Sequence, residues 1–87
     1  MPSSSNNWLV YIILADDQTY YTGVTTDVAR RFQEHAEGRR GAKYFRGRKP
    51  LKVVYTEAGH TRSSACKREA AIKKLSRPQK QRLIVQD

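Results

Sequence analysis

Five side chains in this sequence have the chemistry that phosphodiester hydrolysis requires. They are two tyrosines, an arginine, a histidine and a glutamate: Tyr11, Tyr21, Arg31, His35 and Glu69. Hydrolysis of a phosphodiester needs a base for the attacking water, a cation for the charge that develops on the phosphoryl group, and a metal or acid at the leaving oxygen. The five residue types together could supply all of these groups.

Each of these residues also has an ordinary structural explanation when it is taken alone. Tyrosine favours strands, so Tyr11 and Tyr21 are more often core aromatic residues. Arg31 is more often a surface arginine, and His35 is more often a surface or hydrogen-bonded core histidine. A phenol with a pKa near 10 is a poor base unless nearby cations or a metal lower that pKa, which Arg31 and His35 could do.

Glu69 differs from the other carboxylates in its position. The chain has eight Asp and Glu residues, and the others lie at predicted turns, caps, exposed helix faces or the terminus. Glu69 lies in the middle of a predicted helix, between Ala65 and Ile72, which we expect to be buried. Mg²⁺ takes one or two carboxylates together with waters and phosphate oxygens, so Glu69 is a candidate ligand. The spacing alone favours a simpler alternative, an i, i+4 ion pair with Lys73.

Two apolar runs must position the tyrosines. Residues 8–14 are apolar or aromatic throughout, which indicates a central strand that is covered on both faces. A second strand over 19–24 follows a polar turn at 15–19. In an antiparallel pair, a loop of three or five residues turns Tyr11 and Tyr21 to the same face, whereas a four-residue loop separates them. A shared site therefore requires the odd loop.

The first predicted helix carries Arg31 and His35. Asp27 is a good N-cap, which predicts a helix over 27–37. Arg31 and His35 form a stripe at the edge of its buried face. The residues that we expect to be buried recur at i, i+4 and i+8 and are Val28, Phe32 and Ala36.

The second half of the chain predicts one more strand and two helices. The strand should place Leu51, Val53 and Tyr55 on one face. In order, the elements are a strand over 51–56, a loop over 57–62 and helices over 63–75 and 77–85. The fold class is therefore α+β, a three-stranded antiparallel sheet flanked by helices, in a single domain over 8–87 that follows a disordered tail at 1–7.

The charge of the chain predicts a polyanionic partner. The formal net charge is +9 on 87 residues, which is typical of proteins that bind nucleic acid. No segment approaches the roughly 18 apolar residues of a membrane-spanning helix, so we expect no membrane partner. The first residues do not resemble a secretory signal, and Cys66 is the one cysteine, so we expect a cytoplasmic protein without a disulfide.

A basic loop over 38–50 is the candidate surface for phosphate contacts. Aromatic residues lie among its cations, so that a ring is available for stacking on a base. The alternative is a solvated loop whose two aromatic side chains tuck into the core. The residues that we expect to bind nucleic acid are Arg30, Arg39, Arg40, Lys43, Tyr44, Arg46, Arg48 and Lys73.

Two short motifs give the sequence a family resemblance. Leu9-Val10-Tyr11 and Tyr21-Thr22-Gly23 resemble the two halves of the GIY-YIG nuclease core, and the arginine and glutamate follow in the order of that family. The chain resembles most closely the small stand-alone bacterial GIY-YIG proteins of the YhbQ type, over residues 8–85. The segments that carry the resemblance include Tyr20-Tyr21-Thr22-Gly23-Val24-Thr25-Thr26-Asp27, Arg30-Arg31, His35, Gly41-Ala42-Lys43-Tyr44, Arg48-Lys49-Pro50, Val54-Tyr55, Arg68-Glu69 and Ile72-Lys73-Lys74-Leu75-Ser76.

The resemblance implies a metal-dependent endonuclease that hydrolyses DNA or RNA, with DNA the better candidate and no small-molecule cofactor. Because this core has no dedicated duplex-reading part, the expected substrate is single-stranded or structured. It implies that Tyr11 is the general base or orients the water, and that His35 assists or replaces it. It also implies that Tyr21 positions the scissile phosphate, that Arg31 stabilises the transition state, and that Glu69 holds Mg²⁺ or Mn²⁺. The sequence leaves open a binding module of the same fold without turnover, and a domain that meets an acidic protein.

Overall fold

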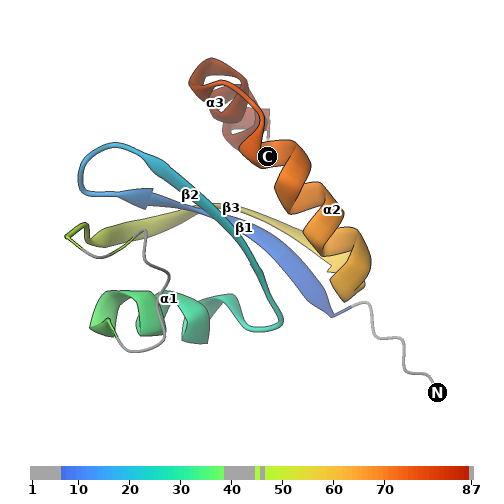
Figure 1. The fold of residues 1–87 in the computed structure, drawn as a ribbon, viewed down its shortest axis with the longest axis horizontal. Coiled ribbons are helices and arrows are strands. Elements are labelled where there is room, and N and C mark those ends of the chain that lie inside the picture. Colours follow the sequence, from blue (N-terminus) through green and yellow to red (C-terminus); the bar gives the residue numbers. More distant parts are fainter. Residues whose placement is uncertain (1–6, 39–44, 46, 87) are drawn as a thin grey trace.

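The computed structural model of the protein describes residues 7–38, 45 and 47–86. Its three strands form one antiparallel sheet in the order β2-β1-β3 (Figure 1). In chain order the elements are β1 (Trp8–Ala15), β2 (Tyr20–Thr25), α1 (Val28–Glu37), β3 (Pro50–His60), α2 (Arg62–Lys73) and α3 (Arg77–Gln86). The predicted α+β fold, with a three-stranded sheet and three helices, is confirmed. Residues 1–6 of the predicted tail lie outside the described residues, and the domain limits remain a prediction.

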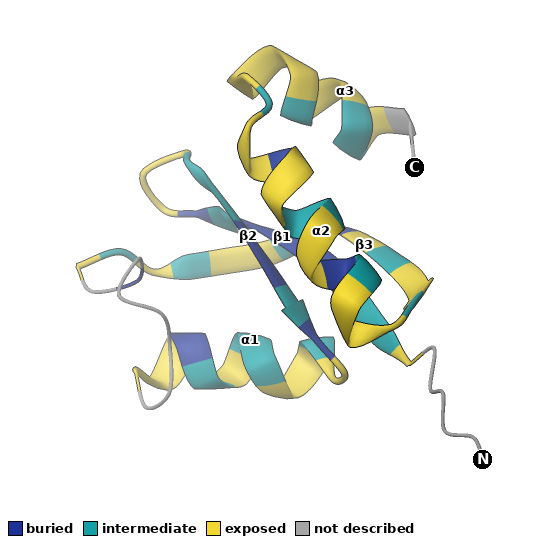
Figure 2. Ribbon diagram, turned by 45° about the vertical axis from the view of Figure 1, so that its right-hand side comes forward, coloured by how far each residue is buried: buried dark blue, intermediate teal, exposed yellow. Residues whose placement is uncertain are grey.

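Strand β1 lies at the centre of the sheet and contributes side chains to two separate hydrophobic cores. Helix α1 covers one face of the sheet, and α2 with α3 covers the other (Figures 1 and 2). The core under α1 is formed by Tyr11, Ile13, Ala15 and Phe45. The core under α2 is formed by Val10, Ile12, Tyr55, Ala65 and Ile72. Because neighbouring side chains of a strand point to opposite faces, an unbroken apolar run supplies both cores.

The β1–β2 turn sets the register that the two tyrosines need. The Ala15 amide donates to the Thr19 carbonyl oxygen at 2.9 Å, which closes a loop of three residues, 16–18. The last of these, Gln18, has a φ of 70°, as expected for the third position of such a loop. Tyr11 lies opposite Gly23, and Tyr21 lies opposite Ile13. The odd loop is confirmed, and both tyrosines lie on the face that α1 covers.

Strand β3 is longer than the sequence predicts and changes face within its length. It runs from Pro50 to His60, so the predicted loop at 57–62 is wrong over most of its range. The pairing with β1 shifts between Ile12, which lies opposite Tyr55, and Ile13, which lies opposite Val53. This irregularity inserts one residue, and the alternation of faces is lost there. Val53 therefore packs under α1 while Tyr55 packs under α2. The predicted common face of Leu51, Val53 and Tyr55 is wrong for Tyr55, whereas Leu51 and Val53 both lie beside α1.

Helix α1 buries a histidine that the sequence places at the edge of its face. Asp27 caps the helix, since its side chain accepts from the Arg30 amide at 3.1 Å. His35 is only 2% exposed, whereas Ala36 is exposed. The prediction that Ala36 is buried is wrong because the inward face runs through Val28, Phe32 and His35, at i, i+4 and i+7.

Helices α2 and α3 cover the second face. Thr61 caps α2, and Ala65 and Ile72 are buried on the side toward the sheet, as predicted. Gln79 accepts a hydrogen bond from the Ser76 amide at 2.9 Å at the start of α3. Leu83 and Ile84 of α3 pack against the α2 core. Among the described residues, no helix has the length and apolar character needed to cross a membrane.

Candidate active site

A hydrogen bond between Tyr11 and His35 lies at the centre of the candidate site. The Tyr11 hydroxyl and His35 Nε2 are 3.0 Å apart, and both residues are almost fully buried. Tyr11 comes from the central strand and His35 from the inward face of α1. A buried polar pair of this kind is stable only because each group satisfies the other. The sequence identified both residues, but not that the fold would bury them together.

Gly23 allows the Tyr11 ring to cross β2. A Cβ atom at Gly23 would lie 2.5 Å from the Tyr11 hydroxyl oxygen and 2.6 Å from the carbon that bears it. No other amino acid fits there unless the ring moves, because real Cβ contacts do not come below about 3.0 Å. The ring therefore extends over the backbone of an edge strand, which carries its hydroxyl toward the outside of the sheet.

Two further rings enclose the pair. The Tyr21 ring centroid lies 6.2 Å from that of Tyr11 and 5.2 Å from that of His35. The Phe45 centroid lies 5.1 Å from Tyr21 and 4.7 Å from His35, and Phe45 is 9% exposed. Phe45 belongs to the predicted basic loop. Its ring packs in the core, which agrees with the alternative of a solvated loop whose aromatic side chains enter the core. The rings exclude water from one side of the His35 imidazole.

Arg31 lies one helical turn before His35, at the edge of the buried face. Its Nη1 donates to Glu34 Oε1 at 2.9 Å, and the Arg31 side chain is 28% exposed. A hydrogen bond and the positive charge of Arg31 also act on the Tyr11 hydroxyl. Arg31 therefore places a positive charge beside the buried Tyr11 oxygen, while its own side chain is still partly exposed to solvent.

Burial keeps both members of the central pair uncharged at neutral pH. Burial, with a contribution from the nearby Tyr21, raises the pKa of Tyr11 well above its ordinary value of 10, and Arg31 opposes this only in part. Burial, followed by the charge of Arg31, lowers the pKa of His35 from 6.5 to about 4. Arg31 lowers the pKa of Tyr11, as the sequence suggested, but desolvation outweighs it. His35 does not contribute to this lowering, because the buried imidazole carries no charge at neutral pH.

Glu69 reaches this group from the opposite face of the sheet. Its charge makes a small contribution to the raised pKa of Tyr11. Lys73 Nζ lies 3.3 Å from Glu69 Oε2 and 6.0 Å from the Tyr21 ring centroid. The i, i+4 ion pair that the sequence offered as the simpler explanation is thus present, and it lies next to the tyrosines. Helices on both faces of the sheet contribute side chains to this one region.

The carboxylates of the candidate site suit a metal ion that takes only one or two ligands from the protein. Within 7–38, 45 and 47–86, no three His, Cys, Asp or Glu side chains gather as a metal cage. Glu69 offers one carboxylate whose side chain is 23% exposed. Mg²⁺ commonly keeps several waters and takes one or two carboxylates plus phosphate oxygens, so a single glutamate fits such an ion.

Most of the predicted nucleic-acid contacts fall on the basic loop, and the described ones are spread around the site. Arg30 is exposed on α1. Arg48 Nε lies 2.6 Å from Asp17 Oδ2, which ties the end of the loop to the β1–β2 turn. Hydrogen bonds from Thr19 and then Arg48 lower the pKa of Asp17 to about 2. The predicted contacts that lie outside the described residues are Arg39, Arg40, Lys43, Tyr44 and Arg46.

The chain matches a family model of the GIY-YIG catalytic domain over residues 7–82. It is 49% identical over 77 residues to a UPF0213 protein of Desulfotalea psychrophila, covering 88% of this chain and 70% of the relative. It is 54% identical over 75 residues to a UPF0213 protein of Halobacterium salinarum, covering 86% and 96%. The solution structure of UPF0213 protein BH0048 from Bacillus halodurans is similar, at a TM-score of 0.58 and 44% identity, covering 92% of this chain and 84% of that one.

Proposed function

The chain belongs to the GIY-YIG family, and we propose that it is a metal-dependent endonuclease that hydrolyses phosphodiester bonds in DNA or RNA, with DNA the better candidate. The family is part of a nuclease superfamily, and its domain spans nearly this whole chain. One observation carries the proposal: the buried Tyr11–His35 hydrogen bond joins β1 to α1, with the Arg31 guanidinium beside it. Lys73 of α2, which is ion-paired with Glu69, lies 6.0 Å from the neighbouring Tyr21 ring centroid.

The Tyr11–His35 pair would move the proton of the attacking water. At neutral pH the phenol keeps its proton, and the proposal takes the neutral imidazole as the tautomer that carries its proton on Nδ1, so that Nε2, 3.0 Å from the phenol oxygen, is the acceptor. As water attacks phosphorus, its proton passes to the Tyr11 oxygen and the phenol proton passes to His35 Nε2. The phosphorus–oxygen bond to the leaving group breaks at the same time, and that oxygen takes a proton from solvent. His35 is thus the final base and Tyr11 the relay.

The cations of the site would stabilise the charge that develops on the phosphate. Arg31 is partly exposed and lies beside the Tyr11 oxygen, so its guanidinium can contact a phosphate oxygen near the attacking water. A bound phosphate would also offset the charge of Arg31 that lowers the pKa of His35, which makes the imidazole a better base when substrate is present. Tyr21 would orient the phosphate by its position beside both catalytic side chains.

Glu69 would hold Mg²⁺ or Mn²⁺, with waters and the substrate completing the ligands. A divalent ion at this place supplies Lewis-acid stabilisation of the leaving oxygen. Lys73 holds Glu69 in an exposed ion pair, and it would leave the carboxylate for a phosphate oxygen when substrate and ion bind. The same side chain would then serve as one of the predicted phosphate contacts.

A cleavage assay with Glu69→Ala tests this function. Labelled single- and double-stranded DNA and RNA are incubated with Mg²⁺ or Mn²⁺. We expect the wild type to cut, and Glu69→Ala to cut about a hundredfold or more slowly while it still binds. Glu37→Ala is the matched control, since it removes one negative charge from an exposed helix position. It should change cleavage less than about threefold.

The assay separates the nuclease from a binding module of the same fold. The already satisfied Glu69–Lys73 pair and the raised pKa of Tyr11 are the observations that favour the module. If the wild type binds nucleic acid and never cuts it with either ion, the nuclease proposal fails and the module stands. If Glu69→Ala cuts at the wild-type rate, only the assignment of the metal to Glu69 fails.

A further inference from the structure

A groove on the far side of α1 is used by none of the chemistry described above. It lies between α1 and the first half of β3 and has a volume of about 440 Å³. Three lining residues come from the helix and three from the strand: Ala29, Phe32, Gln33, Leu51, Lys52 and Val53. The groove therefore lies where a helix meets an edge strand of the sheet, and both its walls belong to the folded core structure.

The lining combines an apolar wall with a few polar groups. Leu51 is 51% exposed, and among the described residues it and Val85 are the large hydrophobic side chains left on the surface. Gln33 supplies an amide with two donors and an acceptor, and Lys52 supplies an ammonium group. No carboxylate is among the described lining residues. An apolar surface with an amide and a cation suits a flat, partly polar ring that is attached to an anion.

The groove and the candidate active site lie on the two flanks of the same helix. On α1, Ala29 and Gln33 share one flank, while Arg31 and His35 share the other. Phe32 lies between the flanks, since it lines the groove and also packs against the core that contains Tyr11. The two places are thus separated by about one helix diameter, roughly 10 Å.

We propose that this groove holds an unpaired base of a single-stranded nucleic acid whose backbone crosses α1 into the active site. The inference rests on the proposed function, because the occupant is its substrate. The exposed Arg30 points outward between the two flanks, where the backbone would cross, and the whole chain carries a net charge of +9. The base would pack on Leu51 and the edge of Phe32 and would bond to Gln33, while Lys52 meets its phosphate.

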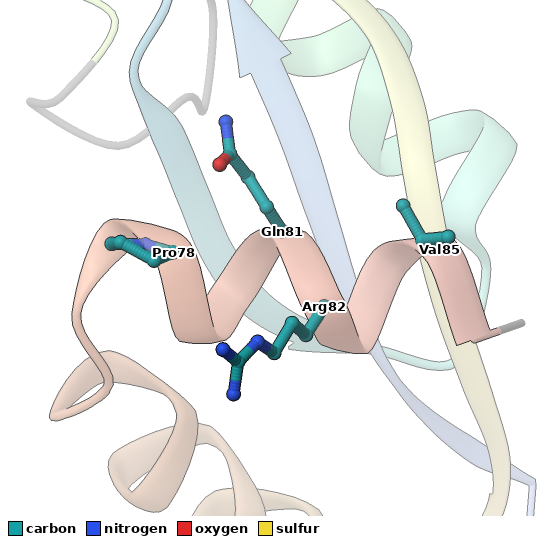
Figure 3. A pocket seen from close by; sticks show the side chains of 4 residues that line it. All are labelled: Pro78, Gln81, Arg82 and Val85. Carbon is teal, nitrogen blue, oxygen red and sulfur yellow. The ribbon is translucent and has the colours of Figure 1, made fainter.

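A hollow of similar size on α3 provides a matched comparison. It has a volume of about 420 Å³ and is lined by Pro78, Gln81, Arg82 and Val85. All four residues come from one helix, and Gln81 and Arg82 point to different sides of it (Figure 3). The hollow offers the same residue types as the groove, an exposed aliphatic side chain, a glutamine and a cation. No second wall is formed by the residues that the structure describes, so we expect this hollow to hold no base.

The test measures binding without cleavage, in the presence of a chelator. Fluorescence anisotropy compares a labelled single strand with a strand of the same length in which every base is replaced by an abasic sugar. We expect the wild-type protein to bind the strand with bases about tenfold more tightly. The double variant Leu51→Ser with Gln33→Ala should narrow that ratio to less than about threefold and keep the affinity for the abasic strand. Val85→Ser with Gln81→Ala should keep the wild-type ratio.

Gln33→Ala alone is the variant that should fold normally, because alanine is a better helix former than glutamine and the position is exposed. It should lower the ratio by about threefold while the thermal transition is unchanged. The proposal is overturned if the wild type binds both strands equally, if the groove variants keep the wild-type ratio, or if they weaken both strands to the same extent. Base-dependent binding through the groove without any cleavage in Mg²⁺ or Mn²⁺ would refute the nuclease, and only the part of this inference that places a base in the groove would stand.

Discussion

The two faces of the sheet have the same central strand but different interiors. The core under α2 is mainly aliphatic and is formed by Val10, Ile12, Ala65 and Ile72 around Tyr55. The core under α1 contains Tyr11 hydrogen-bonded to His35, with two more rings packed around them. Alternate residues of β1 supply the two faces, so one strand both stabilises the protein and positions chemistry.

The difference shows where a small domain can place reactive groups. A chain of 87 residues has room for few buried polar groups, since each must find a partner. Here the hydrogen-bonded pair Tyr11–His35 lies on one face, beside the partly exposed Arg31. The aliphatic face carries the helix that brings Glu69. Stability and function are therefore separable by substitutions on neighbouring residues of β1.

The largest expected effect is a loss of cleavage in Tyr11→Phe that is absent from Ile12→Val, the neighbouring substitution on the other face of the sheet. Tyr11→Phe removes the proton relay and should slow single-turnover cleavage by about 10²- to 10⁴-fold. It should lower the free energy of unfolding by only about 1 to 3 kcal/mol, since the partner nitrogen loses its bond. Ile12→Val, on the other face, should lower that free energy by about 1 kcal/mol and leave the cleavage rate within about twofold. Equal losses of cleavage in both variants would contradict the division of the faces.

The next effect concerns pH and belongs to the α1 face. The pKa of His35 is about 4 in the folded protein and about 6.5 when unfolded, so between these values the unfolded chain binds more protons. Stability therefore rises with pH in this window and falls on acidification. We expect a loss of roughly 1 to 2 kcal/mol between pH 6.5 and 5, measured by urea unfolding. His35→Gln should remove this slope, and a slope that persists in the variant would assign it to other groups.

The smallest effect concerns an imperfection of the α2 face. Thr22 lies opposite Ile12, is 2% exposed, and its hydroxyl has no hydrogen-bond partner among the described residues. Thr22→Val keeps the branched shape and removes the unsatisfied group, so it should stabilise the protein by about 1 kcal/mol. Cleavage should not change. A loss of stability in thermal unfolding would mean that the hydroxyl has a partner and that this face also holds a polar contact.

Much of the fold could be predicted from the sequence, and a few residues show where the prediction failed. The sheet, the three helices, the odd hairpin loop and the burial of Ala65 and Ile72 follow from local patterns of apolar, turn and capping residues. The continuation of β3 to His60 did not follow, because a strand of mixed composition is stabilised by its pairing with β1 and not by its own pattern. The burial of His35 instead of Ala36 likewise depended on which side of α1 met Tyr11.

The sequence by itself determined the order and the types of the reactive groups, because motif spacing and apolar periodicity are local properties of the chain. Only the tertiary structure decided that Tyr11 crosses β2 over Gly23, that it pairs with His35, and that burial leaves both groups uncharged. These facts depend on distances between residues far apart in the chain and on the water excluded around them. Desolvation and close packing exist only once the faces of the sheet are covered.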